Sequence, residues 1–162
     1  MTWVIVGVAA VVLMATYVTW TAGRLDRLHA RVDAAWSALD AQLVRRAAAA
    51  RALGPLLPAG APAEHLDSAA HAALEGQQAG REAVENELSR AVHRVLRLLP
   101  PDADLSELRT AATRVALARS FHNAAVKNTL GLRWRRLPRL LRLAGHRPLP
   151  TFFEIDDTAL AG

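Results

Sequence analysis

The pattern of apolar and polar positions begins with one uninterrupted apolar stretch. Residues 2–23 contain no charged side chain. As a helix, a stretch of this length rises about 33 Å, which is enough to cross a hydrocarbon core of about 30 Å. We therefore expect a transmembrane helix over residues 2–23, with its backbone hydrogen bonds made within the helix because lipid cannot satisfy them.

Three amphipathic regions follow, at residues 24–53, 64–99 and 105–130, and stretches rich in Pro or Gly separate them. The pattern predicts an all-α protein, in which the transmembrane helix precedes an antiparallel bundle of three to four long helices. The apolar faces of these regions consist of Leu25, Leu28, Val32, Ala35, Trp36, Leu39 and Leu43, then Val84, Leu88, Val92 and Val95, then Leu108, Ala112, Val115, Ala118, His122 and Ala125.

Residues 54–62 predict where the first of these helices ends. Residues 24–53 contain neither Pro nor Gly, so we expect one helix to run from the membrane to about residue 53. The stretch 54–62 then contains three Pro and two Gly, which predicts a loop. Leu56 and Leu57 are expected to fold back from this loop onto the bundle.

Two further local patterns bear on the helices that follow. Residues 76–80 have Gly at both ends, so the region 64–99 forms either one helix or two. Asp104 and Glu107 have the spacing of a capping box and predict the start of the last long helix.

Side chains at the ends of the apolar stretch predict how it sits in the membrane. Aromatic rings favour the headgroup level, and basic residues favour the cytoplasmic side. We therefore expect a single-pass cell-membrane protein with its N-terminus outside and the bulk of the chain in the cytoplasm. A cleaved signal peptide fits less well, because the apolar run is long and only Met1 and Thr2 precede its first aromatic residue. A buried core helix also fits less well, because the remaining 139 residues are expected to be too few to enclose an all-apolar helix of this length. The residues that support the anchor are Trp3, Tyr17, Trp20, Arg24 and Arg27, and Arg31 adds to the one-sided charge.

The amino-acid composition excludes several kinds of functional site. The chain has no Cys, which excludes disulfides, thiolate metal sites and cysteine nucleophiles. Asp67, His71 and Glu75 follow one another at helical spacing, but three side chains on one exposed face are more simply a solvated surface than a metal site. His122 is a conceivable general base without a visible nucleophile beside it, so a core position is favoured. We expect no catalytic residue, no metal and no cofactor.

The region from Arg109 to Phe153 contains ten Lys and Arg residues and no acidic residue. Within it, residues 130–147 combine a Leu and Trp face with exposed arginines. This surface is expected to face either a protein partner or anionic lipid. A simple up-and-down order of three helices favours a position far from the membrane, whereas a break at residues 76–80 would bring the region near it. The arginines concerned are Arg133, Arg135, Arg136, Arg139 and Arg142.

Three stretches resemble the LemA family of bacterial membrane proteins. They are LDRLHARVDAAWSALDAQLVRR at residues 25–46, ENELSRAVHRVLRLLP at residues 85–100 and ARSFHNAAVKNTLGLRWRRLP at residues 118–138, the last followed by a Phe-Phe-Glu sequence. The resemblance covers most of the chain. It implies an N-terminal anchor before a bundle of long helices, and it implies no catalytic residues, because none is established for the family.

Two functions remain in consideration. The favoured hypothesis is a membrane-anchored scaffold or interaction module, built from an anchor at residues 1–23, a helical bundle at 24–147 and a tail at 148–162. It predicts a protein partner. The alternative is a membrane-associated enzyme or metal-dependent hydrolase, for which the sequence shows no active site. Nucleic-acid binding is disfavoured, since the basic stretch has no recognisable binding motif with it.

Overall fold

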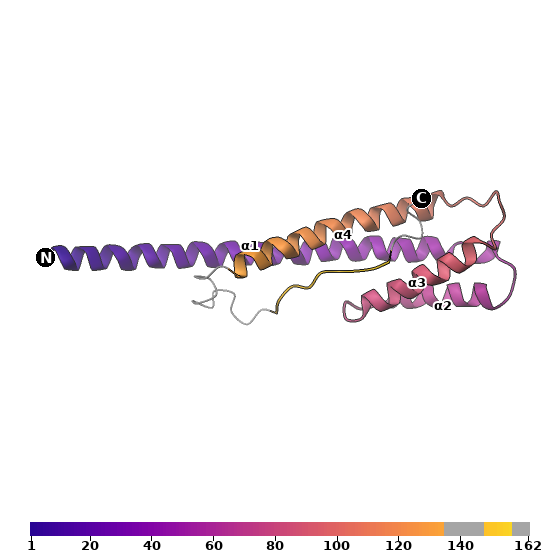
Figure 1. The fold of residues 1–162 in the computed structure, drawn as a ribbon, viewed down its shortest axis with the longest axis horizontal. Coiled ribbons are helices and arrows are strands. Elements are labelled where there is room, and N and C mark those ends of the chain that lie inside the picture. Colours follow the sequence, from indigo (N-terminus) through magenta and orange to yellow (C-terminus); the bar gives the residue numbers. More distant parts are fainter. Residues whose placement is uncertain (135–147, 157–162) are drawn as a thin grey trace. The chain divides into compact units, whose positions relative to one another are not determined.

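The computed structural model describes residues 1–134 and 148–156, and within these ranges the regular structure is helical, without β-strands (Figure 1). The prediction of an all-α protein is therefore confirmed for the described part of the chain. The helices are α1 (Thr2–Arg51), a short 3-10 helix (Gly54–Leu56), α2 (Ala61–Glu75), α3 (Arg81–Leu96) and α4 (Ser106–Arg133).

Helix α1 is continuous from the apolar stretch into the amphipathic region, as predicted. Its 50 residues correspond to about 75 Å of helix. It contains no Pro, and its two glycines, Gly7 and Gly23, do not interrupt it. The helix ends where Gly54 and Pro55 begin the 3-10 helix, because Pro cannot donate the next backbone hydrogen bond.

The loop before α2 depends on Gly60, whose φ of 146° is one that residues with a side chain rarely adopt. The predicted folding back of this loop is correct for Leu57, which is partly buried against the core. It is wrong for Leu56, whose side chain is 45% exposed. The reason is geometric, because neighbouring residues of one helical turn point in different directions.

The region 64–99 forms two helices, and residues 76–80 separate α2 from α3. Gly80 adopts a left-handed φ of 80° directly before α3, which favours Gly at this position. Helix α4 begins after Asp104, whose carboxylate accepts the backbone N–H of Ser106 at 2.8 Å. A hydrogen bond with the Ser106 side chain and, after it, this backbone hydrogen bond lower the pKa of Asp104 from its ordinary value. The backbone hydrogen bond confirms that Asp104 contributes to the start of the helix.

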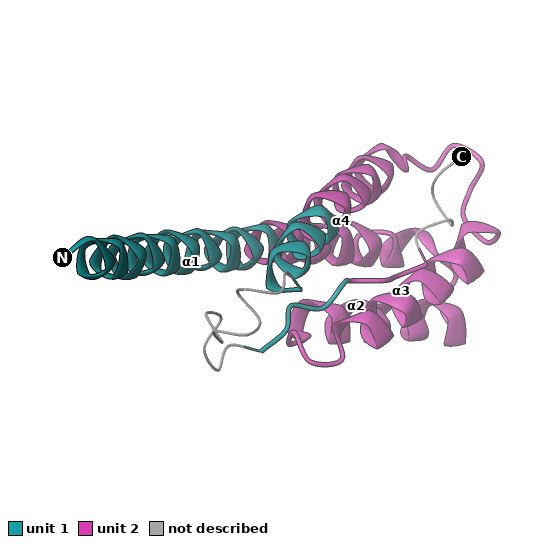
Figure 2. Ribbon diagram, turned by 60° about the vertical axis from the view of Figure 1, so that its left-hand side comes forward, with its two compact units in different colours: residues 1–35, 123–152 teal, residues 36–122, 153–162 magenta. Residues whose placement is uncertain are grey.

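The chain forms two compact units, and both long helices contribute to each (Figure 2). Unit 1 comprises Met1–Ala35 and Asn123–Phe152, and unit 2 comprises Trp36–His122 and Phe153–Gly162. These units follow contacts in space, whereas the division predicted at residues 23 and 147 follows the chain. Grouping by contacts does not test boundaries along the chain, so the division at residues 23 and 147 stays a prediction.

Unit 2 has a core of two apolar clusters. In the larger one, α2 and α3 pack against each other and against the end of α1 and the start of α4, as far as Ala111. The smaller cluster joins Leu39 and Leu43 of α1 to Val115 of α4. Most positions of the predicted apolar faces are buried or half-buried in these clusters, which confirms the helical periodicity.

Unit 1 has a small core in which Val32 of α1 packs with Ala125 and Val126 of α4. In this unit α1 and α4 run antiparallel, because lower residue numbers in α1 meet higher numbers in α4. Thr129 lies 3.5 Å from the carbonyl of Leu28, one turn beyond the contact at Val32.

Trp36 provides a test of the core of unit 2. Its ring is half-buried and packs edge-on against the rings of His122 and Phe153, with 5.5 Å between centroids in each pair. Replacement of a fully buried Trp by Ala costs about 3–5 kcal/mol, so Trp36→Ala is expected to lower the free energy of unfolding by about 2–3 kcal/mol. The measurement is denaturant unfolding of residues 24–162, which we expect to fold without lipid. Leu117→Ala, at a 57% exposed position of α4, is the control and should have little effect.

Candidate functional site

The apolar part of α1 is the first candidate for a functional surface. It is the one helix in the described part of the chain that is long and apolar enough to cross a membrane, and none of its most apolar 18-residue window is buried. The predicted flanking aromatics Trp3, Tyr17 and Trp20 are 88%, 36% and 57% exposed. The guanidinium of Arg24 lies 5.5 Å from the ring centroid of Trp20, a cation–π contact at the end of the apolar stretch.

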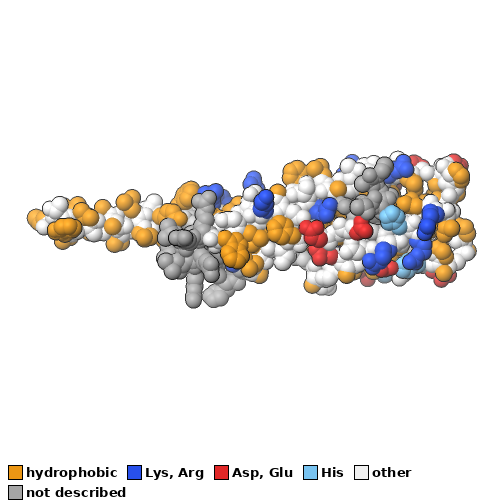
Figure 3. Space-filling view, in the orientation of Figure 1, with side chains coloured by type: hydrophobic (Ala, Val, Ile, Leu, Met, Phe, Trp, Pro, Cys, Tyr) orange, Lys and Arg blue, Asp and Glu red, His pale blue; other side chains and the backbone are white. Residues whose placement is uncertain are grey.

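Arg27 follows one turn after Gly23, and its guanidinium lies over that glycine, where an added Cβ would be 3.7 Å from it. Figure 3 shows hydrophobic side chains along the N-terminal part of the helix and basic side chains after it. The five residues predicted to support the anchor therefore lie on this exposed surface or directly beside it.

Arg133, predicted on a basic surface, is half-buried in unit 1. Its guanidinium donates to the carbonyl of Pro148 at 3.1 Å and lies 3.4 Å from Nε2 of His29. Because Arg can only donate, Nε2 is the acceptor. Nδ1 of His29 then carries the proton and donates to the carbonyl of Leu25 at 2.9 Å. The basic role predicted for Arg133 stays a prediction, and Arg135, Arg136, Arg139 and Arg142 lie outside the described residues.

The contact between Arg133 and His29 also shows which part of α1 the end of α4 lies beside. His29 follows Gly23 by six residues, or about 9 Å of helix. The favoured expectation that this end lies far from the predicted membrane span is therefore wrong. The cause is the break between α2 and α3, which adds one helix and reverses the direction in which α4 runs.

A buried ionic cluster lies in unit 2. Glu85 of α3 is 0% exposed, and its carboxylate pairs with Arg46 of α1 at 2.7 Å and with Arg81 at 3.1 Å. Arg81 is also fully buried, lies 3.3 Å from Asp40 and donates to the carbonyl of Gly76. A Cβ at Gly76 would come within 2.9 Å of the Arg81 guanidinium, so this glycine leaves the room that the arginine occupies.

Burial and charge act in opposite directions on Glu85. Loss of water raises the pKa of its carboxyl, and the two arginines lower it, with burial the larger effect. Such a cluster is costly to form in an apolar interior and still more costly to leave half-paired. The arrangement therefore requires α1 and α3 to pack in one register.

The sequence analysis missed this cluster, although the spacing could have revealed it. Arg81 and Glu85 continue the apolar face of Leu88, Val92 and Val95 toward the start of α3 at the same helical period. Arg46 similarly follows Leu43 by three residues on α1. Two basic residues and one acidic residue on otherwise apolar faces are an indication of a buried ion pair.

The other residues considered as catalytic or metal-binding, His122 and the group Asp67, His71 and Glu75, do not form a common site in the described part of the chain. His122 is 3% exposed and packs against Trp36, consistent with the favoured core position. Asp67, His71 and Glu75 are exposed, and Asp67 pairs with Arg51 at 2.7 Å while His71 lies 3.6 Å from Glu75. Among residues 1–134 and 148–156, no three His, Asp or Glu side chains are grouped as metal ligands would be.

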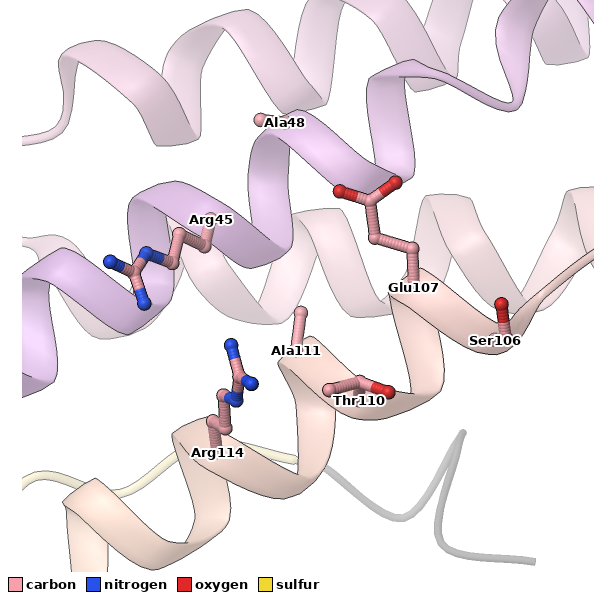
Figure 4. Close-up of a pocket in the computed structure, with 7 residues that line it drawn as sticks. All are labelled: Arg45, Ala48, Ser106, Glu107, Thr110, Ala111 and Arg114. Carbon is pink, nitrogen blue, oxygen red and sulfur yellow. The ribbon is translucent and has the colours of Figure 1, made fainter.

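A hollow of about 270 Å³ opens on the surface of unit 2 between α1 and the first turns of α4. Figure 4 shows the Arg114 side chain extending from α4 toward α1, the Arg45 side chain extending along α1, and Glu107 further along the hollow. Two guanidinium groups can hold a small carboxylate or phosphate, but the Glu107 carboxylate opposes such an ion. The remaining lining residues are Ala48, Ser106, Thr110 and Ala111.

The buried cluster predicts a large difference between two neighbouring glutamates. Glu85→Ala leaves two buried guanidinium groups without their shared carboxylate and is expected to lower the free energy of unfolding by about 3–5 kcal/mol. Glu87→Ala, two residues on, removes an exposed carboxylate that pairs with Arg90 and His65 and should cost less than about 1 kcal/mol. Urea unfolding of both variants measures the difference, and equal losses would contradict the role given to Glu85.

Comparison with known proteins adds no relative to this picture. No family model, no curated protein and no solved structure matches the chain. The resemblance to LemA proteins therefore stays a prediction from the sequence.

Proposed function

We propose that the protein is a single-pass membrane protein of the LemA type, whose antiparallel helical bundle acts in the cytoplasm as a scaffold or interaction module. The observation that carries this proposal is that no residue of the most apolar 18-residue window of α1 is buried. Large apolar side chains that find no partner within a protein favour lipid or another apolar surface over water. The exposed residues are Trp3, Val4, Ile5, Val6, Val8, Val11, Val12, Leu13, Met14 and Trp20.

The orientation rests on charge. Arg24, Arg27 and Arg31 follow the apolar stretch closely, and all three are exposed. Positive residues beside a membrane helix favour the cytoplasmic side. The chain after Gly23 then lies inside the cell.

A pair of exposed apolar side chains on α4 supports a protein partner. Leu117 and Phe121 are 57% and 63% exposed and are four residues apart, so they are neighbours on one face of the helix. Exposed aromatic and aliphatic groups of this kind often anchor protein interfaces.

Anionic lipid is a second partner of the same module. The end of α4 lies beside His29, about 9 Å of helix beyond the apolar stretch and comparable to a Debye length of about 8 Å. Exposed arginines at this level, such as Arg24, Arg27 and Arg31, can each contribute about 1 kcal/mol of attraction to an anionic surface.

The orientation is tested with single cysteines, because the chain has none of its own. Thr2→Cys and Ser106→Cys are placed in separate copies and treated on intact cells with a thiol reagent that does not cross membranes. We expect labelling at position 2 and protection at position 106 until the cells are opened. The opposite pattern would show that the bulk of the chain lies outside.

The interaction role is tested by photo-crosslinking in native membranes. A photoreactive amino acid at Leu117 or at Phe121 should capture the same protein, identified by mass spectrometry, because both positions share one surface. Arg94, an exposed residue of α3, is the matched control and should not capture it. If positions 117 and 121 yield no protein adduct above this control, the proposed surface is wrong.

A further inference from the structure

Two features of unit 2 adjoin on α4, namely the hollow lined by Arg45 and Arg114 and the exposed pair Leu117 and Phe121. Arg114 precedes Leu117 by three residues, and Phe121 follows Leu117 by four, so the three side chains are neighbours on one face of α4. We call these three residues together with Arg45 of α1 the mixed surface. It presents two guanidinium groups at one end and two apolar side chains at the other.

The positive charge of the mixed surface has no counter-charge in the described part of the chain. Arg45 and Arg114 are exposed, and neither forms an ion pair there, whereas the exposed Arg51 pairs with Asp67. Helix α4 contains no acidic residue after its first turn, so it supplies no partner for Arg114. Guanidinium groups bind carboxylates through charge-assisted hydrogen bonds, and two of them at one hollow favour a carboxylate from another molecule.

The hollow restricts where that carboxylate can lie. Its volume is about 270 Å³, and Ala48 and Ala111 are among its lining residues, so short side chains leave room for a side chain of a partner. Glu107 lies further along the hollow (Figure 4) and repels a free anion that diffuses within it. A carboxylate attached to a partner is held in one place by the other contacts of that partner, so it can meet Arg114 without approaching Glu107.

Leu117 and Phe121 supply these other contacts. Their side chains are 57% and 63% exposed, and residues four apart on a helix form a ridge that packs into the groove of another helix. In complexes between an amphipathic helix and a helical surface, the apolar side chains anchor the helix. The charges beside them select the partner by electrostatic complementarity. The mixed surface therefore has both parts of a binding site for a helix.

We propose that the mixed surface binds an acidic amphipathic helix of a partner protein. An Asp or Glu side chain of this helix enters the hollow beside Arg45 and Arg114. Apolar side chains of the same helix, one and two turns away from the acidic residue, cover Leu117 and Phe121. The inference rests on the interaction role proposed above and adds to it the chemistry of the partner.

Charge and position disfavour two other occupants. Two copies anchored in one membrane would meet with the same residues at the same height. Arg45 and Arg114 of one copy would then face those of the other, and like charges repel. Anionic lipid is out of reach, because Arg45 follows Gly23 by 22 residues, or about 33 Å of helix. That distance is several times a Debye length of about 8 Å.

The test uses the full-length protein in native membranes with a photoreactive amino acid in place of Phe121. Arg45→Glu combined with Arg114→Glu should reduce the yield of the protein adduct at least tenfold, because the carboxylate of the partner then meets like charge. Arg94→Glu combined with Arg97→Glu, at exposed positions near the end of α3, changes the net charge equally and should leave the yield within twofold. Arg45→Gln combined with Arg114→Gln removes the charge without reversing it and should give an intermediate yield.

The captured stretch of the partner gives a second readout. Mass spectrometry of the adduct should place the crosslink in a sequence with Asp or Glu three or four residues from an apolar position. Arg in place of that acidic residue in the partner should restore the yield with the variant that carries Arg45→Glu and Arg114→Glu, because the two charges are then exchanged.

The outcomes separate this inference from the proposed interaction role. If both charge-reversal variants lower the yield equally, or neither lowers it, selection by Arg45 and Arg114 is disproved while the interaction role stands. An adduct with a stretch that lacks Asp and Glu, with nucleic acid or with a second copy of this chain would also disprove the inference. If Phe121 gives no adduct even with all arginines in place, the proposed surface fails and the inference fails with it.

Discussion

The structure depends on the unbroken hydrogen-bonding of α1 across the point where the apolar stretch gives way to charged residues. Lipid and water make opposite demands on side chains, but a helical backbone satisfies its hydrogen bonds in both. One helix can therefore present an apolar surface on all sides over its first part and an amphipathic surface beyond Arg24. The described apolar clusters involve α1 residues from Val32 onward, so a break near Gly23 would separate the apolar stretch from the packed part of the helix.

Within unit 2 the apolar faces alone leave some freedom in how the helices pair. Many of the core residues are alanines, such as Ala47, Ala70 and Ala91, and small side chains of one size can interdigitate in more than one register. The carboxylate of Glu85 limits that freedom, because it must meet Arg46 and Arg81 at the same time. A slip of one helical turn would leave buried charges without partners, at a cost of several kcal/mol.

The sequence predicted the features that depend on local periodicity. The continuous first helix, the loop at residues 54–62 and the buried faces of α3 and α4 follow from spacing and from Pro and Gly positions, which act over a few residues. The sequence left the break at 76–80 undecided, because isolated Gly residues are tolerated within helices. The break determines the end of the molecule at which α4 stops, and the wrong preference for a position far from the predicted membrane span followed from leaving the break undecided.

The candidate sites were harder to predict, since each joins residues far apart in the sequence. Glu85 and Arg46 are 39 residues apart, and the backbone N–H of Asp156 donates at 2.8 Å to Asn86, which lies 70 residues earlier in the chain. No local pattern shows that such residues meet. The Phe-Phe-Glu sequence was noted only as part of a resemblance, although the alternation of Phe153, Glu154, Ile155 and Asp156 already has the form of an extended segment with one apolar side.

The continuity of α1 also makes it a mechanical coupling element. A continuous helix transmits rotation about its axis, so a rotation of the apolar stretch turns the side of the helix that holds His29 and Val32 by the same angle. One residue inserted at Gly23 would rotate that side by about 100° and advance it by about 1.5 Å. The hydrogen bond between His29 and Arg133 at 3.4 Å would then point away from its partner. The number of residues between the apolar stretch and His29 thus sets the rotational angle between that stretch and the contact with α4 in unit 1.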